Sequence, residues 1–263
     1  MKLSIIIPVY NEEKTVAEII KKVFASPIKL EKEVIVVNDG STDDSLAKIK
    51  RFKRKNLKVI SHKKNQGKGM AIRTGLKKVT GQIVLIQDAD LELNPRDYPA
   101  LLGPILTGKA KVVYGTRWAK RGNRRPGVFY LGNLFLTGLT NFLYKTDLSD
   151  MYCGYKVFKT EVLKNISLAC RRFEFCPEVT AKLTQKDIKI VEVPIRYQPR
   201  NIFFAGKKLK WYDGGVAAVT LLKYRFNWEK ILTVSFVVWG FWVFGDFFFW
   251  LFKERIWPLW QKL

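Results

Sequence analysis

The sequence predicts an α/β fold in which helices cover both faces of a mostly parallel sheet. Short apolar runs rich in β-branched residues alternate with segments of helical spacing about five times before residue 116. Polar or acidic residues follow directly on three of these runs, at positions 10–13, 39–43 and 88–92. The chain of 263 residues is long enough for one sizeable domain and a smaller appendage.

The apolar runs are expected to be strands, and the segments between them helices. The strands are expected at 3–9, 33–38, 57–61, 82–87 and 111–115. The helices are expected at 12–24, 41–52, 67–78 and 95–106. Ser41, Thr42 and Asp43 supply an N-cap and a first-turn acid for the second helix, and Pro95 suits the first turn of the fourth.

The pattern changes beyond residue 115. A basic loop at 118–127 is followed by a strongly apolar helix at 129–144. The remaining predicted elements are a strand at 154–159, a helix at 173–186, a strand at 189–193 and a basic amphipathic helix at 207–226. The sequence contains no internal repeat and no low-complexity linker.

The charge balance indicates polyanionic partners. Lys and Arg number 47 against 23 Asp and Glu, so the formal net charge is +24. Such an excess suits nucleic acid, an anionic membrane surface or phosphorylated substrates. Cys153, Cys170 and Cys176 are odd in number and lack metal-ligand spacing, and no signal peptide precedes the first strand. These features favour a reducing, cytosolic compartment.

The C-terminal segment at 231–252 is almost wholly apolar, and Asp246 is its single charge. About 22 residues at a rise of about 1.5 Å make a helix of about 33 Å, enough to cross a hydrocarbon core of about 30 Å. The alternatives are a buried core helix, or a segment that enters the bilayer without crossing it. Lys and Arg are denser before this segment than after it, which predicts a single-pass membrane protein whose main domain faces the cytoplasm.

Four parts are therefore expected along the chain. They are a main domain at 1–206, a basic amphipathic interface helix at 207–230, a single transmembrane helix at 231–252 and a short interfacial tail at 253–263. The transmembrane helix would also be a contact for a homo-oligomer.

Three carboxylates stand at alternate positions where the fourth strand ends. Asp88, Asp90 and Glu92 follow the run at 82–87. In open α/β sheets ligands bind at the carboxyl ends of strands, and oxygen ligands suit a hard divalent cation that bridges to phosphates. The alternative is a solvated acidic turn.

The first two strands end in further polar residues that would share this crevice. Tyr10 and Glu12 follow the first strand, and Asp39 follows the second. The Asp39 carboxylate can accept a hydrogen bond from a base N–H or a ribose hydroxyl; the alternative is a turn followed by a helix cap. The glycines and Lys68 of the segment 65–69 are placed to approach phosphates at a helix N-terminus, although the segment lacks Walker spacing.

Taken together and in order, these motifs resemble a known family. They are Pro-Val-Tyr-Asn-Glu at 8–12, Asn-Asp-Gly-Ser-Thr-Asp at 38–43, Asn-Gln-Gly-Lys-Gly at 65–69, Gln-Asp-Ala-Asp at 87–90 and Gly-Thr-Arg at 115–117. The chain resembles the family 2 glycosyltransferases of the GT-A fold and, within them, the dolichyl-phosphate mannose and dolichyl-phosphate glucose synthases. The resemblance covers residues 3–227, including Pro-Arg at 199–200 and Trp-Tyr-Asp-Gly at 211–214.

The resemblance implies an inverting, metal-dependent transfer of a hexose from a nucleotide-diphosphate sugar to a membrane polyprenyl or dolichyl phosphate. It assigns the catalytic role to Asp88, Asp90 and Arg117, and the cofactor, Mg2+ or Mn2+, to Asp88, Asp90 and Glu92. It places the nucleotide sugar on Pro8, Tyr10, Glu12, Asp39, Lys68, Asp88, Ala89 and Asp90. It places the acceptor phosphate on Arg117, Arg200, Lys207 and Lys208.

The donor sugar stays open between three choices. GDP-mannose is the first choice, and UDP-glucose and UDP-N-acetylhexosamine are the alternatives. Mannose synthases often carry Gln where Glu92 stands, which weakens the choice of mannose. Another membrane-associated acceptor is disfavoured, because the Gln-x-x-Arg-Trp signature of processive synthases is absent.

The chemistry of a phosphate acceptor agrees with this reading. A phosphate monoester has a second pKa of about 6, so at pH 7 it attacks without a protein base. His62, the single histidine, is therefore expected to be structural. Asp150 and Glu178 are expected to orient basic side chains; the alternative for both is a role as auxiliary acid or base. A non-catalytic membrane or nucleic-acid binding module is disfavoured, because a polyanion binder gains nothing from carboxylates in its crevice.

Overall fold

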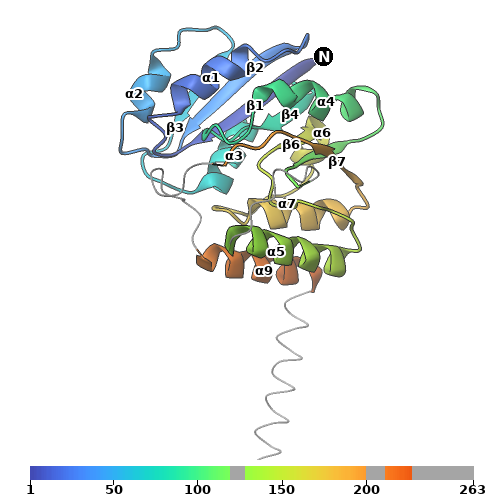
Figure 1. The fold of residues 1–263 in the computed structure, drawn as a ribbon. Helices are drawn as coiled ribbons and strands as arrows, with labels where there is room; N and C mark the ends of the chain where they lie inside the picture. The colour runs from blue at the N-terminus through green and yellow to red at the C-terminus, as the bar shows by residue number, and fades with distance from the viewer. Residues whose placement is uncertain (119–127, 200–210, 227–263) are drawn as a thin grey trace, which may run out of the picture. The chain divides into compact units, whose positions relative to one another are not determined.

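The computed structural model describes residues 1–118, 128–199 and 211–226 (Figure 1). The chain divides into two units, Met1–Leu221 and Leu222–Leu263. The first unit carries the sheet and its helices. Of the second unit, the described residues are those at 222–226, which continue the last helix.

The first unit is built on a seven-stranded sheet in the order β3-β2-β1-β4-β6-β5-β7. The strands are β1 (Lys2–Val9), β2 (Glu31–Asn38), β3 (Leu57–Ser61), β4 (Ile83–Ile86), β5 (Val112–Thr116), β6 (Lys156–Lys159) and β7 (Ile190–Pro194). All neighbours pair in parallel except β6, which is antiparallel to both β4 and β5. The predicted mostly parallel sheet is confirmed.

The helices follow the predicted order, with three differences. They are α1 (Val16–Phe24), α2 (Ser45–Lys50), α3 (Lys68–Leu76), η1 (Pro95–Asp97), α4 (Tyr98–Leu106), α5 (Val128–Tyr144), α6 (Thr160–Lys164), α7 (Phe175–Thr184) and α9 (Trp211–Arg225). Helices α1 and α2 begin four residues later than predicted. The short helix α6 was not predicted, because its five residues follow β6 without a turn signal.

The predicted cap of the second helix is wrong in position. The capping position of α2 is Asp44, whose side chain makes no capping bond. The Asp43 carboxylate instead accepts hydrogen bonds from the backbone N–H groups of Ser45 (3.0 Å) and Glu13 (3.0 Å). It therefore ties the turn after β1 to the turn after β2. Pro95 does begin a helical turn, with Asn94 as its N-cap.

Alternate residues of each strand point to opposite faces and build two apolar layers. On one face Ile5 and Ile7 of β1 pack with buried residues of α1 and α4. On the other face Ile6 packs with buried residues of α3, α5 and α7, the last two of which lie below the sheet in Figure 1. Each fully buried aliphatic or Phe side chain contributes about 1.5–3 kcal/mol, so these layers hold the strand register.

The antiparallel strand β6 has a direct consequence for the carboxyl edge of the sheet. Its first residue, Lys156, pairs with Ile86 at the end of β4 and with Tyr114 near the end of β5. The connection from α5 to β6 therefore arrives at the edge where the parallel strands end. This places residues 149–154 beside the predicted ligand crevice.

The expected single-pass membrane arrangement is corrected by the structure. No helix in the described part of the chain is long and apolar enough to cross a membrane. The longest of the described helices, α5, has 17 residues and a length of about 26 Å, short of a hydrocarbon core of about 30 Å. The transmembrane helix expected at 231–252 and the tail at 253–263 lie outside the described residues, as does the homo-oligomer contact assigned to that helix.

Candidate active site

The predicted polar residues meet at the carboxyl edge of the sheet because β1 lies between β2 and β4. Val9 pairs with Asn38, and Ile6 pairs with Ile86. The backbone N–H of Asp39 donates to the carbonyl of Val9 (2.7 Å). The chain segments that carry Tyr10, Asp39 and Asp88 therefore leave the sheet side by side.

Asp39 is buried and ties β2 to the segment that precedes α3. Its Oδ2 accepts a hydrogen bond from the N–H of Gly67 (2.7 Å), and its Oδ1 accepts one from the N–H of Gln66 (3.0 Å). The Nδ1 of His62 lies 2.6 Å from Asp39 Oδ1, and its Nε2 lies 2.9 Å from Thr74 Oγ1. His62 therefore links Asp39 to Thr74 of α3, a contact that was not predicted. The structural role of His62 stays a prediction.

The backbone N–H groups at the start of α3 bond to the chain itself. Gly69 donates to the carbonyl of Arg172 (3.0 Å), and Met70 donates to that of Arg171 (2.8 Å). Gly67 has a φ of 96°, and a Cβ there would collide with the carbonyl oxygen of Arg171. Of the phosphate-binding groups predicted in this segment, the side chain of Lys68 is the one that faces the carboxylates.

Lys68 and Asp88 form an ion pair. The Nζ of Lys68 lies 2.5 Å from Asp88 Oδ1, and both side chains are 21% exposed. Burial opposes the charge of Lys68, but the Asp88 carboxylate raises the pKa of that ammonium above its ordinary value. The other oxygen of Asp88 packs against Gly154, where an added Cβ would collide with it. Gly154 is therefore required by the position of Asp88.

The oxygen donors after β4 fit a hard divalent cation in chemistry, although they are not gathered in this structure. Asp88 is already paired with the positive charge of Lys68. Asp90 Oδ1 accepts a hydrogen bond from the N–H of Glu92 (3.1 Å), around Leu91 at a φ of 63°. Among the residues described, no three His, Cys, Asp or Glu side chains form a group that could hold a metal, so Asp88, Asp90 and Glu92 do not converge. Carboxylate oxygens are nevertheless the ligands that Mg2+ and Mn2+ prefer.

Arg117 is fixed by the buried carboxylate of Asp150. Arg117 Nε lies 2.7 Å from Asp150 Oδ2, and Nη2 lies 2.7 Å from Oδ1. The guanidinium carbon lies 4.8 Å from the ring centre of Trp118 and 5.2 Å from that of Tyr197, which adds cation–π attraction. Burial opposes the charge, but Asp150 raises the pKa of Arg117. The prediction that Asp150 orients a basic side chain is confirmed.

Two further groups donate hydrogen bonds to the Asp150 carboxylate. It accepts hydrogen bonds from the backbone N–H of Arg117 (3.0 Å) and from Nδ2 of Asn133 on α5 (3.0 Å). Glu178, the other carboxylate expected to orient a base, lies 2.6 Å from Lys182 Nζ and accepts the N–H groups of Ala169 and Cys170. Glu178 therefore fixes the segment whose neighbours, Arg171 and Arg172, accept the first N–H groups of α3.

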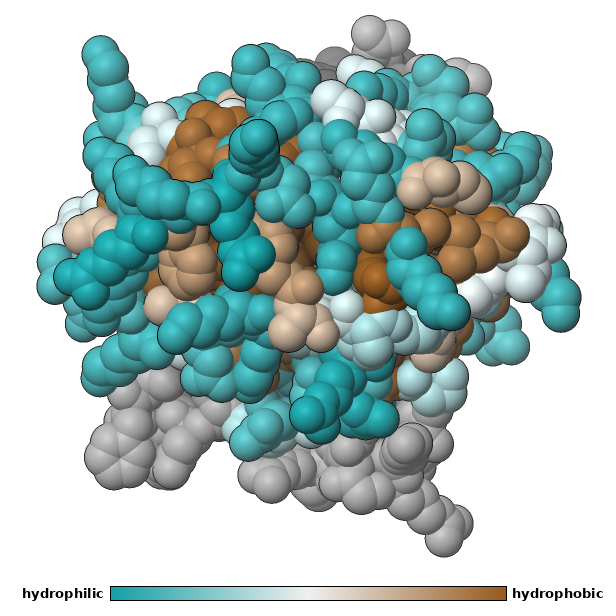
Figure 2. Space-filling view, turned by 90° about the horizontal axis from the view of Figure 1, so that it is seen from above, coloured by the Kyte–Doolittle hydropathy of each residue, from teal (hydrophilic) through white to brown (hydrophobic). Residues whose placement is uncertain are grey.

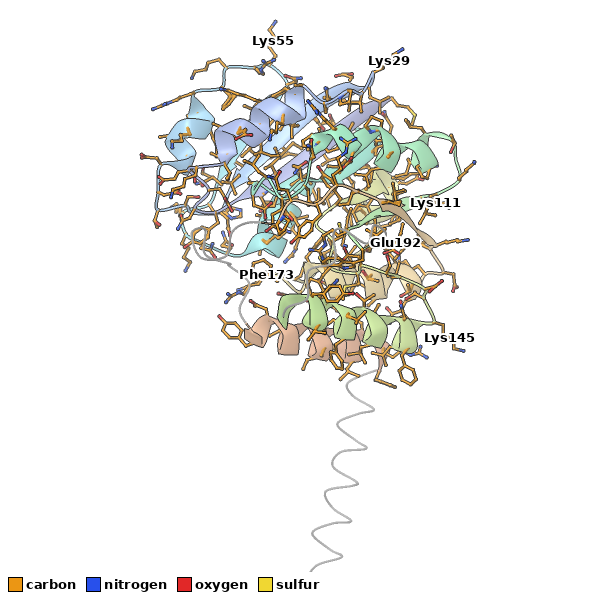
Figure 3. All side chains as sticks on the ribbon, viewed as in Figure 1. Lys29, Lys55, Lys111, Lys145, Phe173 and Glu192 are labelled. Atoms are coloured by element: carbon orange, nitrogen blue, oxygen red, sulfur yellow. The ribbon has the colours of Figure 1, made fainter. Side chains whose placement is uncertain are left out.

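One short loop contacts both halves of the site, namely the Asp88 carboxylate and the Arg117 guanidinium. In residues 149–154, Asp150 bonds Arg117 and Gly154 packs against Asp88. Glu192 of β7, labelled in Figure 3, accepts the N–H groups of Ser149 (2.7 Å) and Asp150 (2.9 Å) at the start of the loop. Sequence reasoning singled out Asp150 but missed that this loop joins Arg117 to Asp88, because the contacts involve residues that are far apart in the chain. A signal was present in Gly154, a glycine two residues before the start of β6.

The other predicted residues fall into two groups. Pro8 is in β1, Tyr10 is partly buried just beyond it, and Ala89 is buried next to Asp88. Glu12 is buried; its Oε2 accepts the Thr15 hydroxyl (2.7 Å) and its N–H donates to Ser45 Oγ (2.8 Å). Arg200, Lys207 and Lys208 lie outside the described residues.

Gln87, which was not predicted as a site residue, fixes the end of β4. Its side chain is buried, and its Oε1 accepts the hydroxyl groups of Tyr98 (2.7 Å) and Tyr155 (2.9 Å). These two bonds fix the side chain of the residue that precedes Asp88.

Several characterised proteins are similar to this chain in sequence. The dolichol-phosphate mannosyltransferase of Pyrococcus furiosus is 28% identical over 260 residues, which cover 96% of this chain and 72% of that protein. The UDP-N-acetylglucosamine–dolichyl-phosphate N-acetylglucosaminyltransferase of Methanococcus voltae is 30% identical over 213 residues, or 73% of this chain and 84% of that protein. The dodecaprenyl-phosphate galacturonate synthase of Rhizobium johnstonii is 24% identical over 212 residues, and the match spans 60% of its length.

The fold is also shared with solved structures. Glucosyl-3-phosphoglycerate synthase from Mycobacterium tuberculosis matches with a TM-score of 0.66 and 24% identity, over 85% of this chain and 80% of that chain. The model of the glycosyl transferase family 2 matches residues 4–167, which is more than half of the chain. This match contains β1 to β6 with the carboxylates after β4 and the Arg117–Asp150 pair. The resemblance noted in the motifs is thereby confirmed, and the chain is a glycosyltransferase that belongs to family 2.

Proposed function

We propose that the chain transfers a hexose from a nucleotide-diphosphate sugar to a membrane polyprenyl or dolichyl phosphate, with inversion at the anomeric carbon. The observation that carries the proposal is the pairing of two differently charged centres across one loop. Asp88 packs against Gly154 at the end of residues 149–154, and the guanidinium of Arg117 is held by Asp150 near the start of the same loop. The names of the relatives support the acceptor, since three of them act on dolichyl or dodecaprenyl phosphates.

The donor would bind at the carboxyl ends of β1, β2 and β4. Pro8, Tyr10, Glu12, Asp39 and Ala89 would contact the nucleotide, with Lys68 near its phosphates. Asp88, Asp90 and Glu92 would hold Mg2+ or Mn2+, which when bound neutralises the charge of the diphosphate leaving group. The ion pair with Lys68 keeps Asp88 neutralised before the donor arrives.

The acceptor would bind on the side of Arg117. A phosphate monoester is mostly dianionic at pH 7, so its oxygen needs no base to remove a proton. It needs a cation that offsets the repulsion from the donor's phosphates. Arg117 supplies such a cation in a fixed position, because Asp150 and two aromatic rings hold its guanidinium. Arg200, Lys207 and Lys208 are proposed to add further positive charge.

The lipid part of the acceptor would be met at a membrane surface by α5 and α9. Leu131 (61% exposed), Phe135 (66%) and Phe142 (81%) recur along α5, and Val216 and Val219 are exposed on α9. The face seen in Figure 2 is by contrast mostly hydrophilic, with apolar patches between its polar side chains. Apolar helix faces flanked by basic residues such as Lys223 and Arg225 suit the interface of an anionic bilayer.

The donor is proposed to be GDP-mannose, with UDP-glucose and UDP-N-acetylhexosamine as the competing donors. The relatives divide between mannose, N-acetylglucosamine and galacturonate, so similarity alone does not choose. Each radiolabelled donor would be incubated with a polyprenyl phosphate in vesicles, and the chloroform-soluble label counted. Asp90→Asn serves as the inactive control. We expect label with one donor and none after chelation by EDTA. The absence of a lipid-soluble sugar with every donor would contradict the proposal.

A further inference from the structure

We propose that Lys156 is a positioning residue that fixes the loop at 149–154 and, through it, both Asp88 and Arg117. Lys156 contacts neither centre itself. Its effect on catalysis rests on the proposed function, whereas its effect on the loop rests on the geometry alone.

Lys156 is a fully buried lysine with an unusual set of partners. It is the first residue of β6, and its side chain is inaccessible to solvent. Its Nζ donates to the carbonyls of Met151 (2.8 Å) and Cys153 (3.0 Å) and lies 3.7 Å from the ring centre of Tyr114. None of the ion pairs among the described residues includes it.

Burying an ammonium without a carboxylate is unfavourable, since its hydration is lost. A methionine would fill nearly the same space without that cost. The two carbonyl bonds and the aromatic ring offset part of the cost, and all of these partners lie in or next to the loop. The charge is therefore placed where it fixes loop backbone, which points to a role beyond packing.

The two carbonyls that Lys156 contacts belong to residues that lie, in the sequence, between Asp150 and Gly154. Asp150 stands before Met151 and bonds Arg117, while Gly154 stands after Cys153 and packs against Asp88. Glu192 holds the first part of the loop through the N–H groups of Ser149 and Asp150. Lys156 holds the second part, so the loop has one anchor for each half of the site.

Loss of the Lys156 contacts would shift Arg117 and Asp88 together. The loop would then place Asp150 and Gly154 less sharply, so Arg117 and Asp88 would lose their mutual position. Misplacement of reacting groups by about 1 Å can cost about a hundredfold in rate. We expect Lys156→Met to lower kcat about a hundredfold, and to raise KM for donor and acceptor together rather than for one alone.

The test separates the loop from the overall fold. Hydrogen exchange would be followed at the loop amides of Asp150, Met151 and Cys153, which are bonded to Glu192, Thr137 and Asp150 respectively. In Lys156→Met we expect about tenfold faster exchange at these amides and a Tm equal to or above that of the wild type, because a buried charge is removed. Lys164→Met is the matched control, since Lys164 Nζ also donates to a carbonyl, that of Val79 (3.2 Å), away from the site.

Each outcome decides the proposal. Wild-type exchange in the loop of Lys156→Met would overturn it whatever the activity, and faster exchange with unchanged kinetics would overturn its catalytic part. If Lys156→Met does not fold, Lys156→Gln replaces it, because its neutral amide can keep one carbonyl bond while the charge is removed, and the loop amides must still exchange faster than in the wild type. If the wild type transfers no sugar to any polyprenyl phosphate, the proposed function fails, while the exchange experiment still decides whether Lys156 anchors the loop.

Discussion

Asp150 holds Arg117 through two hydrogen bonds of 2.7 Å each, from Nε to Oδ2 and from Nη2 to Oδ1. The carboxylate is fully buried, and the arginine side chain is 16% exposed. A planar guanidinium held in this way keeps a fixed direction, as the binding of a phosphate beside the donor requires. In the proposed reaction Asp150 would therefore act through Arg117, and no role as an acid or base is needed for it.

Breaking this pair should destabilise the fold. Asp150→Ala leaves the buried guanidinium of Arg117 without its counter-charge, which typically costs about 3–5 kcal/mol. Urea unfolding of the wild type and the variant measures the loss. Glu18→Ala is the control, because its pair with Lys22 is solvent-exposed and is worth about 1 kcal/mol or less. Equal losses in the two variants would show that the Arg117–Asp150 pair is not the anchor described here.

Lys68 should compete with the divalent cation for Asp88. Replacing it by Met removes the ammonium 2.5 Å from Asp88 Oδ1, so the carboxylate becomes available to a metal. We expect Lys68→Met to bind Mn2+ about tenfold more tightly without nucleotide, a change of about 1.4 kcal/mol, as measured by the loss of the free Mn2+ electron paramagnetic resonance signal. Lys64→Met, an exposed lysine of the same segment, should bind like the wild type. Unchanged or weaker Mn2+ binding by Lys68→Met would show that the Lys68 ammonium and the divalent cation do not compete for Asp88.

Glu33 should make stability depend on pH in acid. Burial alone would raise its pKa, but hydrogen bonds from Ser4, Thr80 and Lys58 lower it from 4.5 to about 2. The folded state therefore holds fewer protons than the unfolded state between these values, and stability is lost as the pH falls from about 4.5 towards about 2. Above pH 4.5 the contribution is complete. Chemical unfolding at a series of pH values should show this loss in the wild type.

The matched variant for this measurement is Glu33→Gln, which cannot titrate. Its stability should be lower at neutral pH and should fall less steeply in acid than that of the wild type. Parallel curves for the two proteins would mean that the low pKa of Glu33 does not contribute to the pH dependence.

The exposed apolar residues of α5 should govern binding to membranes. Phe135→Ser and Phe142→Ser each remove a large side chain that is 66% and 81% exposed respectively. A side chain of this size contributes about 1.5–3 kcal/mol when buried, so each change should weaken binding to phosphatidylglycerol vesicles about tenfold or more in flotation. Leu106→Ser on α4 is the control, at 45% exposure away from these helices. Equal binding by all three variants would exclude α5 as the contact surface.

Much of the fold follows from local periodicity, and the remainder depends on contacts that are distant in the sequence. The apolar runs of β1, β2 and β4 identify buried strands because nearly every residue of such a run is buried. The four residues of β6 carry no sign of their direction or of their place between β4 and β5. Strand pairing is set by the whole sheet, so this insertion could not be predicted.

The site residues also divide into those that the sequence predicts and those that depend on distant contacts. Asp39 and Asp88 were predicted because each follows a strand whose end is marked by polar residues, whereas Arg117 was predicted from the family resemblance alone. Asp150 was expected to orient a basic side chain, but its partner could not be named, since Arg117 is 33 residues away. Gly154 was not predicted at all, since it reaches Asp88 through the tertiary fold. Lys156 was missed for a physical reason: lysine is seldom fully buried, so in a short strand it suggests a solvent-facing position.

The most direct test of the proposed reaction compares a phosphate acceptor with its alcohol. Vesicles containing either a polyprenyl phosphate or the matching polyprenol would be supplied with the active radiolabelled donor and Mg2+. In the proposed reaction the fixed cation of Arg117 would bind a nucleophile that is already ionised. We therefore expect lipid-linked sugar from the phosphate and none above background from the polyprenol. Comparable transfer to the polyprenol would contradict the proposal, because a hydroxyl nucleophile requires a base that it does not include.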